Sequence, residues 1–150
     1  MNLRTFSIVA IIGSTLLTAC ATSGPKFTEM TAAMNAAAKP GMGRVYFYRT
    51  TALGAAVQPE VRLNGEAVGR AVPHGFFFAD RPPGNYEVST STEVERKLTF
   101  TLEANQSRYV RLNISMGFFV GHVYGELVDE AKGASEIADM RYIGTPLATP

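Results

Sequence analysis

Hydrophobic and polar residues follow three different patterns along the 150-residue chain. The stretch TFSIVAIIGSTLL, residues 5–17, is mostly apolar and carries no charge. In residues 27–37, apolar side chains recur at the spacing of an α-helix. From Arg44 onward, short apolar stretches alternate with turn residues, which is typical of β-strands. The three patterns predict an apolar leader, a helix and a β-rich domain.

The apolar leader has the composition of an export signal. Arg4 gives its start a positive charge, the apolar run follows, and the small residues Thr18 and Ala19 end it. A segment of this kind defines a secretory signal peptide, here residues 1–19. The apolar run is shorter than the roughly 20 residues that a transmembrane helix needs.

Cys20, the only cysteine of the chain, follows this leader directly. Together, Leu17, Thr18, Ala19 and Cys20 closely resemble a bacterial lipobox. The resemblance implies cleavage before Cys20 and acylation of its thiol and new amine, and two or more acyl chains hold a protein stably on a membrane. The alternative is an ordinary secreted protein with a cysteine at this point by chance. In a Gram-negative host, Ala21 in place of aspartate favours the outer membrane, facing the periplasm.

Residues 20–43 are predicted to form a lipid-anchored tether. ATSGPK is loop-like, whereas Phe27, Met30 and Met34 mark one face of an alanine-rich helix of about three turns. The helix would end at KPGMG. We expect a helical spacer; the alternatives are a helix packed on its own domain and a peptide that docks on a partner.

The next stretch predicts strands joined by tight turns. Residues 44–50 are β-branched and aromatic on both faces, which indicates a central strand. Asn64-Gly65 predicts a hairpin between strands at 57–63 and 66–72, because both turn residues accept positive φ. An aromatic strand at FFF, a Pro-Pro-Gly turn and a strand beginning near Tyr86 follow.

The last third of the chain continues the β pattern. A second hairpin is expected over residues 96–115, with a turn at 103–106, and a last strand over 117–128. A short C-terminal helix and a flexible tail, residues 143–150, complete the chain. We therefore predict an all-β fold, a single antiparallel β-sandwich of about seven strands over residues 44–142.

One stretch resembles known families. VRLNGEAVGRAVPHGFFFADRPPGNYEV has the strand, Asn-Gly, strand, aromatic strand and Pro-Gly-x-Tyr order of PEGA and carboxypeptidase-regulatory sandwich modules. With RVYFYR before it and MGFFVGHVYGELVDEAKGASEIADM after it, the chain is similar to bacterial lipoproteins of the domain of unknown function 2846 family. That resemblance implies an envelope β-sandwich and brings no catalytic residues.

Charge excludes nucleic acid as the partner. The chain has 14 Lys and Arg and 13 Asp and Glu, and removing Arg4 with the signal peptide leaves 13 of each. Both signs are interspersed, so the basic stripe that nucleic acid requires and a polybasic membrane patch are both absent from the sequence.

The reactive residues do not form a catalytic pattern. The serines lie outside a Gly-x-Ser-x-Gly elbow, and His74 and His122 lack the spacing of zinc ligands. A zinc site would require the fold to bring both histidines to Asp80. We expect no catalytic residues, no metal and no cofactor.

Aromatic clusters are the stronger lead to a binding site. Neighbouring aromatics on a strand point to opposite faces, so one of each pair must be covered or exposed. Covering by the tether helix or by EIADMRY is the favoured solution, and exposure to a partner is the alternative. The candidate partner-binding residues are Tyr46, Tyr48, Phe77, Phe118 and Phe119.

The predicted function is that of a lipid-anchored cell-envelope protein with a non-catalytic protein-binding or scaffold module. The alternative is a lipoprotein that binds cell-wall or surface glycan. The two differ in whether exposed aromatics lie on a flat apolar patch or in a polar cleft with Arg and Asn nearby. A metal-dependent enzyme is much less favoured.

Overall fold

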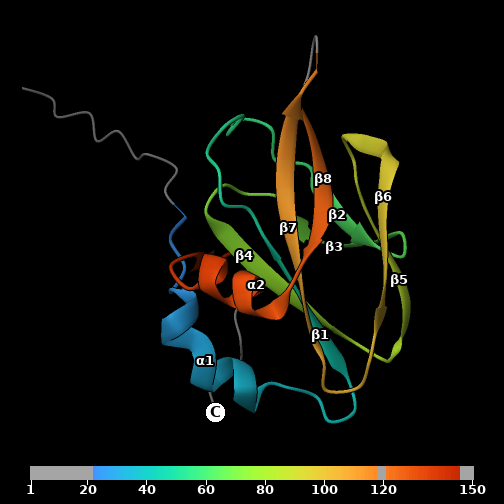
Figure 1. Cartoon of the computed structure of the whole chain (residues 1–150). Coiled ribbons are helices and arrows are strands. Elements are labelled where there is room, and N and C mark those ends of the chain that lie inside the picture. The colour runs from blue at the N-terminus through green and yellow to red at the C-terminus, as the bar shows by residue number, and fades with distance from the viewer. Residues whose placement is uncertain (1–21, 118–120, 146–150) are drawn as a thin grey trace, which may run out of the picture.

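The computed structural model describes residues 22–117 and 121–145, and there the chain forms two β-sheets and two helices (Figure 1). The elements in chain order are α1 (Phe27–Ala36), β1 (Gly43–Tyr48), β2 (Glu60–Leu63), β3 (Glu66–Arg70), β4 (Gly75–Arg81), β5 (Gly84–Thr90), β6 (Glu93–Leu102), β7 (Ser107–Met116), β8 (Gly121–Val128), α2 (Glu130–Ile137) and β9 (Arg141–Tyr142). The predicted all-β class and both predicted helices are confirmed. The signal peptide, Cys20 and its lipobox, and residues 146–150 lie outside the described residues.

The strand pairing differs from the predicted one. One sheet has the order β8-β7-β1-β4-β9 and the other the order β3-β2-β5-β6, so the described residues form nine strands where about seven were expected. β1 pairs with β7, and β4 with β9, in parallel, which corrects the purely antiparallel prediction. The reason is the long connection: the chain builds the whole second sheet between β1 and β7 and can therefore return in the same direction.

The first predicted hairpin is confirmed. β2 and β3 pair antiparallel on either side of the Asn64-Gly65 turn. Asn64 has φ 51° and Gly65 φ 81°, the left-handed conformations on which the prediction rested. The Pro-Pro-Gly-x-Tyr motif also folds locally, because the Tyr86 hydroxyl donates to the Pro82 carbonyl at 2.7 Å.

The second predicted hairpin is wrong. β6 pairs with β5, whereas β7 pairs with β1 and β8, so the turn at 103–106 carries the chain from one sheet to the other. Phe100 and Leu102 still face the same interior as Val110 and Leu112. Two strands with alternating apolar residues can pair within one sheet or face each other from two sheets. The alternation is the same in both arrangements and does not distinguish them.

The main core lies between the two sheets. It combines side chains from β1, β2, β4, β5, β6, β7 and β8. At its centre Phe47 stacks on Phe77, with ring centroids 5.0 Å apart and planes at 14°. β1 is buried along its whole length, as predicted for a central strand.

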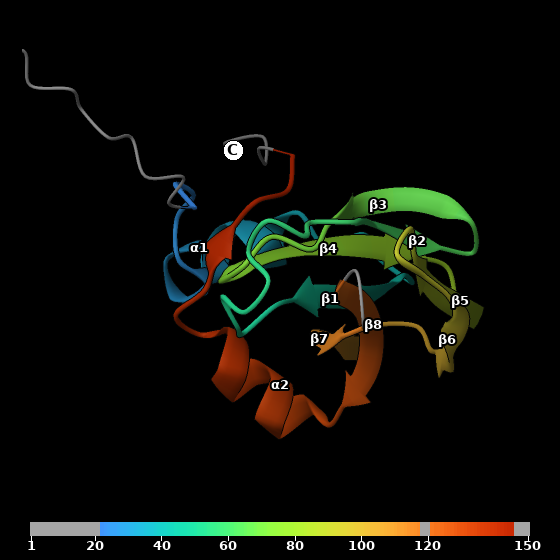
Figure 2. The same ribbon diagram turned by 90° about the horizontal axis from the view of Figure 1, so that it is seen from above.

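A second core covers the outer face of the five-stranded sheet. α1 contributes Met30 and Met34, which are 7% and 1% exposed, and α2 contributes Ile137. The Phe27 ring meets those of Tyr46 and Phe76 edge to face, at 5.7 and 5.4 Å. Figures 1 and 2 both place α2 beside β7, where Gly133 permits close contact with a tyrosine of that strand.

The segment expected to be a tether is part of the folded body from Thr22 onward. The Phe27 amide donates to the Met140 carbonyl at 3.0 Å, and the Tyr142 amide to the Pro25 carbonyl at 2.8 Å. The spacer prediction is therefore corrected for residues 22–43, because the apolar side of α1 is needed to cover the sheet. The predicted tail also begins later, since the Ile143 amide donates to the Phe76 carbonyl.

None of the helices in residues 22–117 and 121–145 is long and apolar enough to cross a membrane.

Candidate functional site

The aromatic residues predicted to bind a partner are mostly interior. Tyr46, Tyr48 and Phe77 are 7%, 0% and 2% exposed. Phe77 points into the main core and the two tyrosines lie under the helices. This corrects their assignment to an exposed binding surface: α1 and α2 cover the face on which the tyrosines lie. Phe118 and Phe119 lie outside the described residues.

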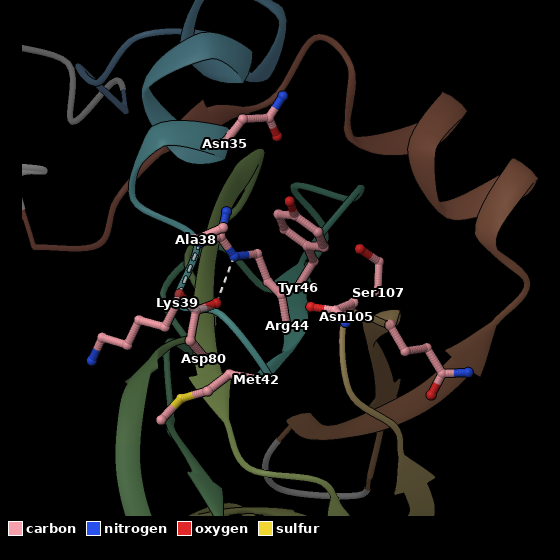
Figure 3. A pocket seen from close by; sticks show the side chains of 10 residues that line it. Asn35, Ala38, Lys39, Met42, Arg44, Tyr46, Asp80, Asn105 and Ser107 are labelled. Carbon is pink, nitrogen blue, oxygen red and sulfur yellow. Dashed lines mark hydrogen bonds and ion pairs between the residues drawn. The ribbon is translucent and has the colours of Figure 1, made fainter.

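A polar hollow opens where the end of α1 meets the start of β1, the end of β4 and the turn between β6 and β7 (Figure 3). Its volume is about 220 Å³. This is below the range of about 300–1,000 Å³ that is usual for small-molecule sites, and suits one unit of a larger ligand. The lining residues are Asn35, Ala38, Lys39, Met42, Arg44, Tyr46, Asp80, Asn105, Gln106 and Ser107.

A buried ion pair lies against the hollow. Arg44 Nε and Nη2 donate to the two carboxylate oxygens of Asp80 at 2.6 and 2.8 Å, and Nη1 donates to the Met34 carbonyl at 2.8 Å. Burial lowers the pKa of Arg44, but hydrogen bonding and charge from Asp80 and Tyr46 outweigh it, and the pKa is raised. The guanidinium is therefore a fixed cation, whose charge Asp80 neutralises.

The turn between β6 and β7 is fixed against the end of α1 and the start of β1. The Asn105 amide donates to the Met42 carbonyl at 3.0 Å, and the Arg44 amide to the Gln106 carbonyl at 2.8 Å. Asn105 has φ 58°, a conformation that asparagine tolerates better than most residues. The hollow is therefore formed by backbone that the fold already holds in place.

The rim of the hollow offers hydrogen-bonding groups. Figure 3 shows the Tyr46 hydroxyl directed toward the side of the hollow where Asn35 lies. Asn35, Asn105 and Lys39 are exposed and Ser107 is half-buried. Among the described residues, no hydrogen bond or ion pair involves the side chains of Asn35, Lys39, Asn105 or Ser107. Amide, hydroxyl and ammonium groups of this kind suit a ligand rich in hydroxyl or carbonyl oxygen.

The chemistry of the hollow is that of recognition. Both oxygens of Asp80 accept from Arg44, so this carboxylate is engaged in the ion pair. Ser107 has no histidine or free carboxylate among the lining residues to activate it. The arrangement can orient a polar group but offers no nucleophile and base in contact.

The zinc arrangement weighed from the sequence is not assembled. His74 precedes the first residue of β4, whereas Asp80 lies near its other end, about 20 Å away at 3.3 Å per residue. His122 Nδ1 lies 2.7 Å from the Thr92 carbonyl oxygen. In the part of the chain that is described, no three His, Cys, Asp or Glu side chains are grouped to hold a metal ion.

A second polar cluster fastens α2 to the sheet. Arg111 bridges Glu126 and Glu136 at 2.8 Å each, and Tyr48 donates to Glu136 at 2.7 Å. Burial is the main cause that raises the pKa of Tyr48, followed by its bond to Glu136. Each charge here has its partner within the protein, so the cluster is structural.

Only weak signals of the hollow are present in the sequence. Arg44 and Asp80 occupy opposite positions of the β1–β4 pair, and a basic and an acidic residue at the ends of two apolar strands could have indicated an ion pair. Asn35, Asn105 and Ser107 carry no such signal, because they come from a helix end and a turn whose meeting depends on the tertiary fold.

The fold and the site define a mostly-β protein of two sheets, with two helices on one sheet and a small polar hollow at one end. The chain belongs to the family described as "Protein of unknown function (DUF2846)", whose family model matches residues 39–123. An uncharacterized protein of Haemophilus influenzae is similar at 28% identity over 139 residues, 90% of this chain and 83% of the relative.

A solved structure is also similar in part. The N-terminal domain of AlgF from P. aeruginosa matches with 20% identity and a TM-score of 0.38, covering 59% of this chain and 98% of that one. A likeness at this TM-score supports no conclusion about the present chain.

Proposed function

We propose that the chain is a lipid-anchored protein of the bacterial cell envelope whose β domain binds its ligand without catalysis. The support for the anchor is the succession of a positive start, an apolar run and Leu17-Thr18-Ala19-Cys20. A thioether-linked lipid at Cys20 uses the only cysteine of the chain. The location that follows is the outer membrane, facing the periplasm.

The proposed ligand is a hydroxyl-rich unit of cell-wall or surface glycan. The observation that carries this choice is the polar hollow, in which Tyr46 lies beside Arg44 with Asn35 and Asn105 at the rim. A polar cleft of this kind is what glycan binding was expected to use, whereas protein binding was expected to use a flat apolar patch. Sugars would be held by side-chain amides and hydroxyls rather than by stacking, because Tyr46 already stacks on Tyr109 at 5.0 Å.

A protein partner is the second candidate, favoured by a different observation. β3 is the end strand of its sheet, and among the described strands it pairs only with β2, so its other edge can accept an added strand. Glu66 and Arg70 at its ends oppose indiscriminate pairing. The scaffold function proposed from the sequence would use this edge instead of the buried aromatics.

The lipid anchor is tested with Cys20→Ser. We expect the variant to leave the membrane fraction and to appear in the soluble periplasmic fraction, because the mature chain then carries no acyl chains to hold it on the bilayer. Cell fractionation and the mass of the mature N-terminus provide the measurement. A variant that stays with the membrane would show that the lipobox assignment is wrong.

The glycan proposal is tested with the Cys20→Ser protein in two binding experiments. One measures its retention on purified cell-wall sacculi, and the other uses amide chemical shifts to measure its binding to soluble sugar fragments of those sacculi. Asn35→Ala and Ser107→Ala should each weaken binding about 3- to 10-fold, the effect of one lost hydrogen bond. Thr28→Ala, an exposed polar residue of the same helix outside the hollow, is the matched control. Binding that all three variants retain equally, or no binding to sacculi, would reject the hollow as a glycan site.

A further inference from the structure

The folded body begins within two residues of the proposed anchor. Cys20 precedes Thr22 by two positions, a span of at most about 7 Å. Thr22 is already attached, because its hydroxyl donates to the Pro73 carbonyl at 3.5 Å. Arg141 Nη1 donates to the Gly24 carbonyl at 2.9 Å, which fixes the next turn of the chain. If Cys20 is acylated, the domain has no slack with which to move away from the bilayer.

The exposed large apolar side chains are linked to this segment through a short series of contacts. The residue after Pro73, His74, donates its amide to the Arg49 carbonyl, and Arg49 donates to the Leu53 carbonyl. Leu53 is 58% exposed and Met116 is 65% exposed, and within the described residues they are the only large hydrophobic side chains left so open. They come from the loop between β1 and β2 and from the end of β7, which both lie at the top of Figure 1. Gly54 packs against Ile114 of β7, so the two elements are in contact.

A buried arginine holds the loop of Leu53 in place. Arg49 is fully buried, and its Nη1 donates to the carbonyls of Val57 and Ala71 at 2.7 and 2.9 Å. Its Nη2 donates to the carbonyls of Leu53 and Gly54. No carboxylate is bonded to it in the described part of the chain. The hydrogen bonds of Arg49 thus fix the backbone of the loop between β1 and β2. This loop holds the Leu53 side chain exposed to solvent.

The same part of the molecule carries positive charge. Arg70 donates from Nε and Nη2 to the Gln58 carbonyl, and Arg141 donates to the Gly24 carbonyl. Both residues are exposed, and neither forms an ion pair within the described residues. A hollow lined by Thr22, Gln58, Tyr142 and Gly144 among others lies beside the start of the described chain. Guanidinium groups without carboxylate partners are complementary to anionic phosphate.

From these observations we infer that one face of the domain, formed around Thr22 by Leu53, Arg70, Met116 and Arg141, rests on the surface of the membrane that holds the anchor. We call it the anchor face. Leu53 and Met116 enter the interfacial layer, and the two arginines meet lipid phosphates. The inference rests on the proposed lipid anchor and adds the orientation of the domain.

The orientation has a consequence for the polar hollow. The anchor face includes the Gly75 end of β4, next to β9, whereas Asp80 and the hollow lie toward the other end. The two are about 17 Å apart along the strand, at 3.3 Å per residue. The hollow therefore faces away from the lipid, toward the space in which cell-wall material is found.

The test places an environment-sensitive fluorophore on single cysteines of the lipidated full-length protein in vesicles of phosphatidylethanolamine and phosphatidylglycerol. Since Cys20 is acylated, an engineered cysteine is the only free thiol of the mature chain. Probes on Leu53→Cys and Met116→Cys should emit a blue-shifted and several-fold brighter signal when the lipidated protein is bound to vesicles. The reference is the same labelled variant that also carries Cys20→Ser and is dissolved in buffer without detergent. Ala104→Cys, in the exposed turn at the opposite end, is the matched control and should not change.

The arginines are tested in the same assay. The double variant Arg70→Gln, Arg141→Gln should reduce the signal of the Leu53 probe at least twofold in anionic vesicles. Arg108→Gln is the control, because Arg108 Nε also donates to a backbone carbonyl, that of Thr101, at 3.1 Å. This variant should leave the signal of the Leu53 probe unchanged. The inference would be overturned if the probes at positions 53 and 116 gave the fluorescence of a water-exposed dye, as the probe at position 104 is expected to do.

The assay separates this inference from the proposed anchor. A protein that fails to sediment with vesicles, or that lacks acyl chains by mass, refutes the anchor itself. A protein that is acylated and bound, but whose Leu53 and Met116 probes stay in water, refutes only the orientation.

Discussion

Met34→Ala is expected to lower the free energy of unfolding by about 2–5 kcal/mol, the usual cost of truncating a buried methionine to alanine. Met34 is 1% exposed and belongs to the cluster that α1 forms with Tyr46, Tyr48 and Tyr109. Its removal leaves a cavity under the helix, which the rigid aromatic rings of the sheet cannot fill. Urea unfolding of the soluble Cys20→Ser form provides the measurement.

Met116→Ala is the matched control for this prediction, because the substitution is the same but Met116 is 65% exposed. We expect its effect to stay within about 0.5 kcal/mol, as is usual for surface positions. Equal midpoints for the two variants would mean that α1 is a spacer after all. Deleting residues 22–40 should give a still larger loss, since it uncovers the part of the outer face that α1 covers.

The sequence predicted most elements and few of their partners. The helix at α1, the buried strand β1 and the Asn64-Gly65 hairpin all depend on local spacing and turn chemistry, which a sequence displays directly. The placement of β7 beside β1 depends on contacts between residues that are far apart in the chain. Local pattern gives no information on that choice, and the nearest strand in sequence, β6, was the wrong partner.

The aromatic residues illustrate the same limit. Alternation along β1 indicates that Tyr46 and Phe47 point to opposite faces, and this is observed. It does not indicate what covers the face of Tyr46. Covering by the tether helix or by EIADMRY was the favoured expectation, and it is confirmed, because α1 and residues 137–142 pack there. Alternation alone did not decide between this covering and exposure to a partner.

The polar hollow could not be predicted from the sequence, for a related reason. Its groups come from the end of α1, the start of β1, the end of β4 and the turn between β6 and β7. Asn35, Asn105 and Ser107 are ordinary polar residues at ordinary positions. They become a candidate site only because the corrected topology brings the turn against the helix.

The buried pair of Arg44 and Asp80 gives the second large expected effect: Asp80→Asn should lower the free energy of unfolding by about 3–5 kcal/mol. The side chains are 9% and 11% exposed, so the variant leaves a guanidinium cation in the interior with no counter-charge. Arg44 also donates to the Met34 carbonyl, and its displacement would loosen the end of α1. Chemical unfolding measures the loss.

Two further variants decide whether the buried charge is the cause. Glu60→Gln removes one partner of the pair with Arg62, whose side chains are 41% and 49% exposed, and should cost less than about 1 kcal/mol because water screens that pair. The double variant Arg44→Met, Asp80→Leu should recover most of the loss, since it leaves no unpaired charge. If Asp80→Asn costs no more than Glu60→Gln, the guanidinium must reach water in solution. If the double variant is as unstable as the single one, geometry rather than charge is what the pair contributes.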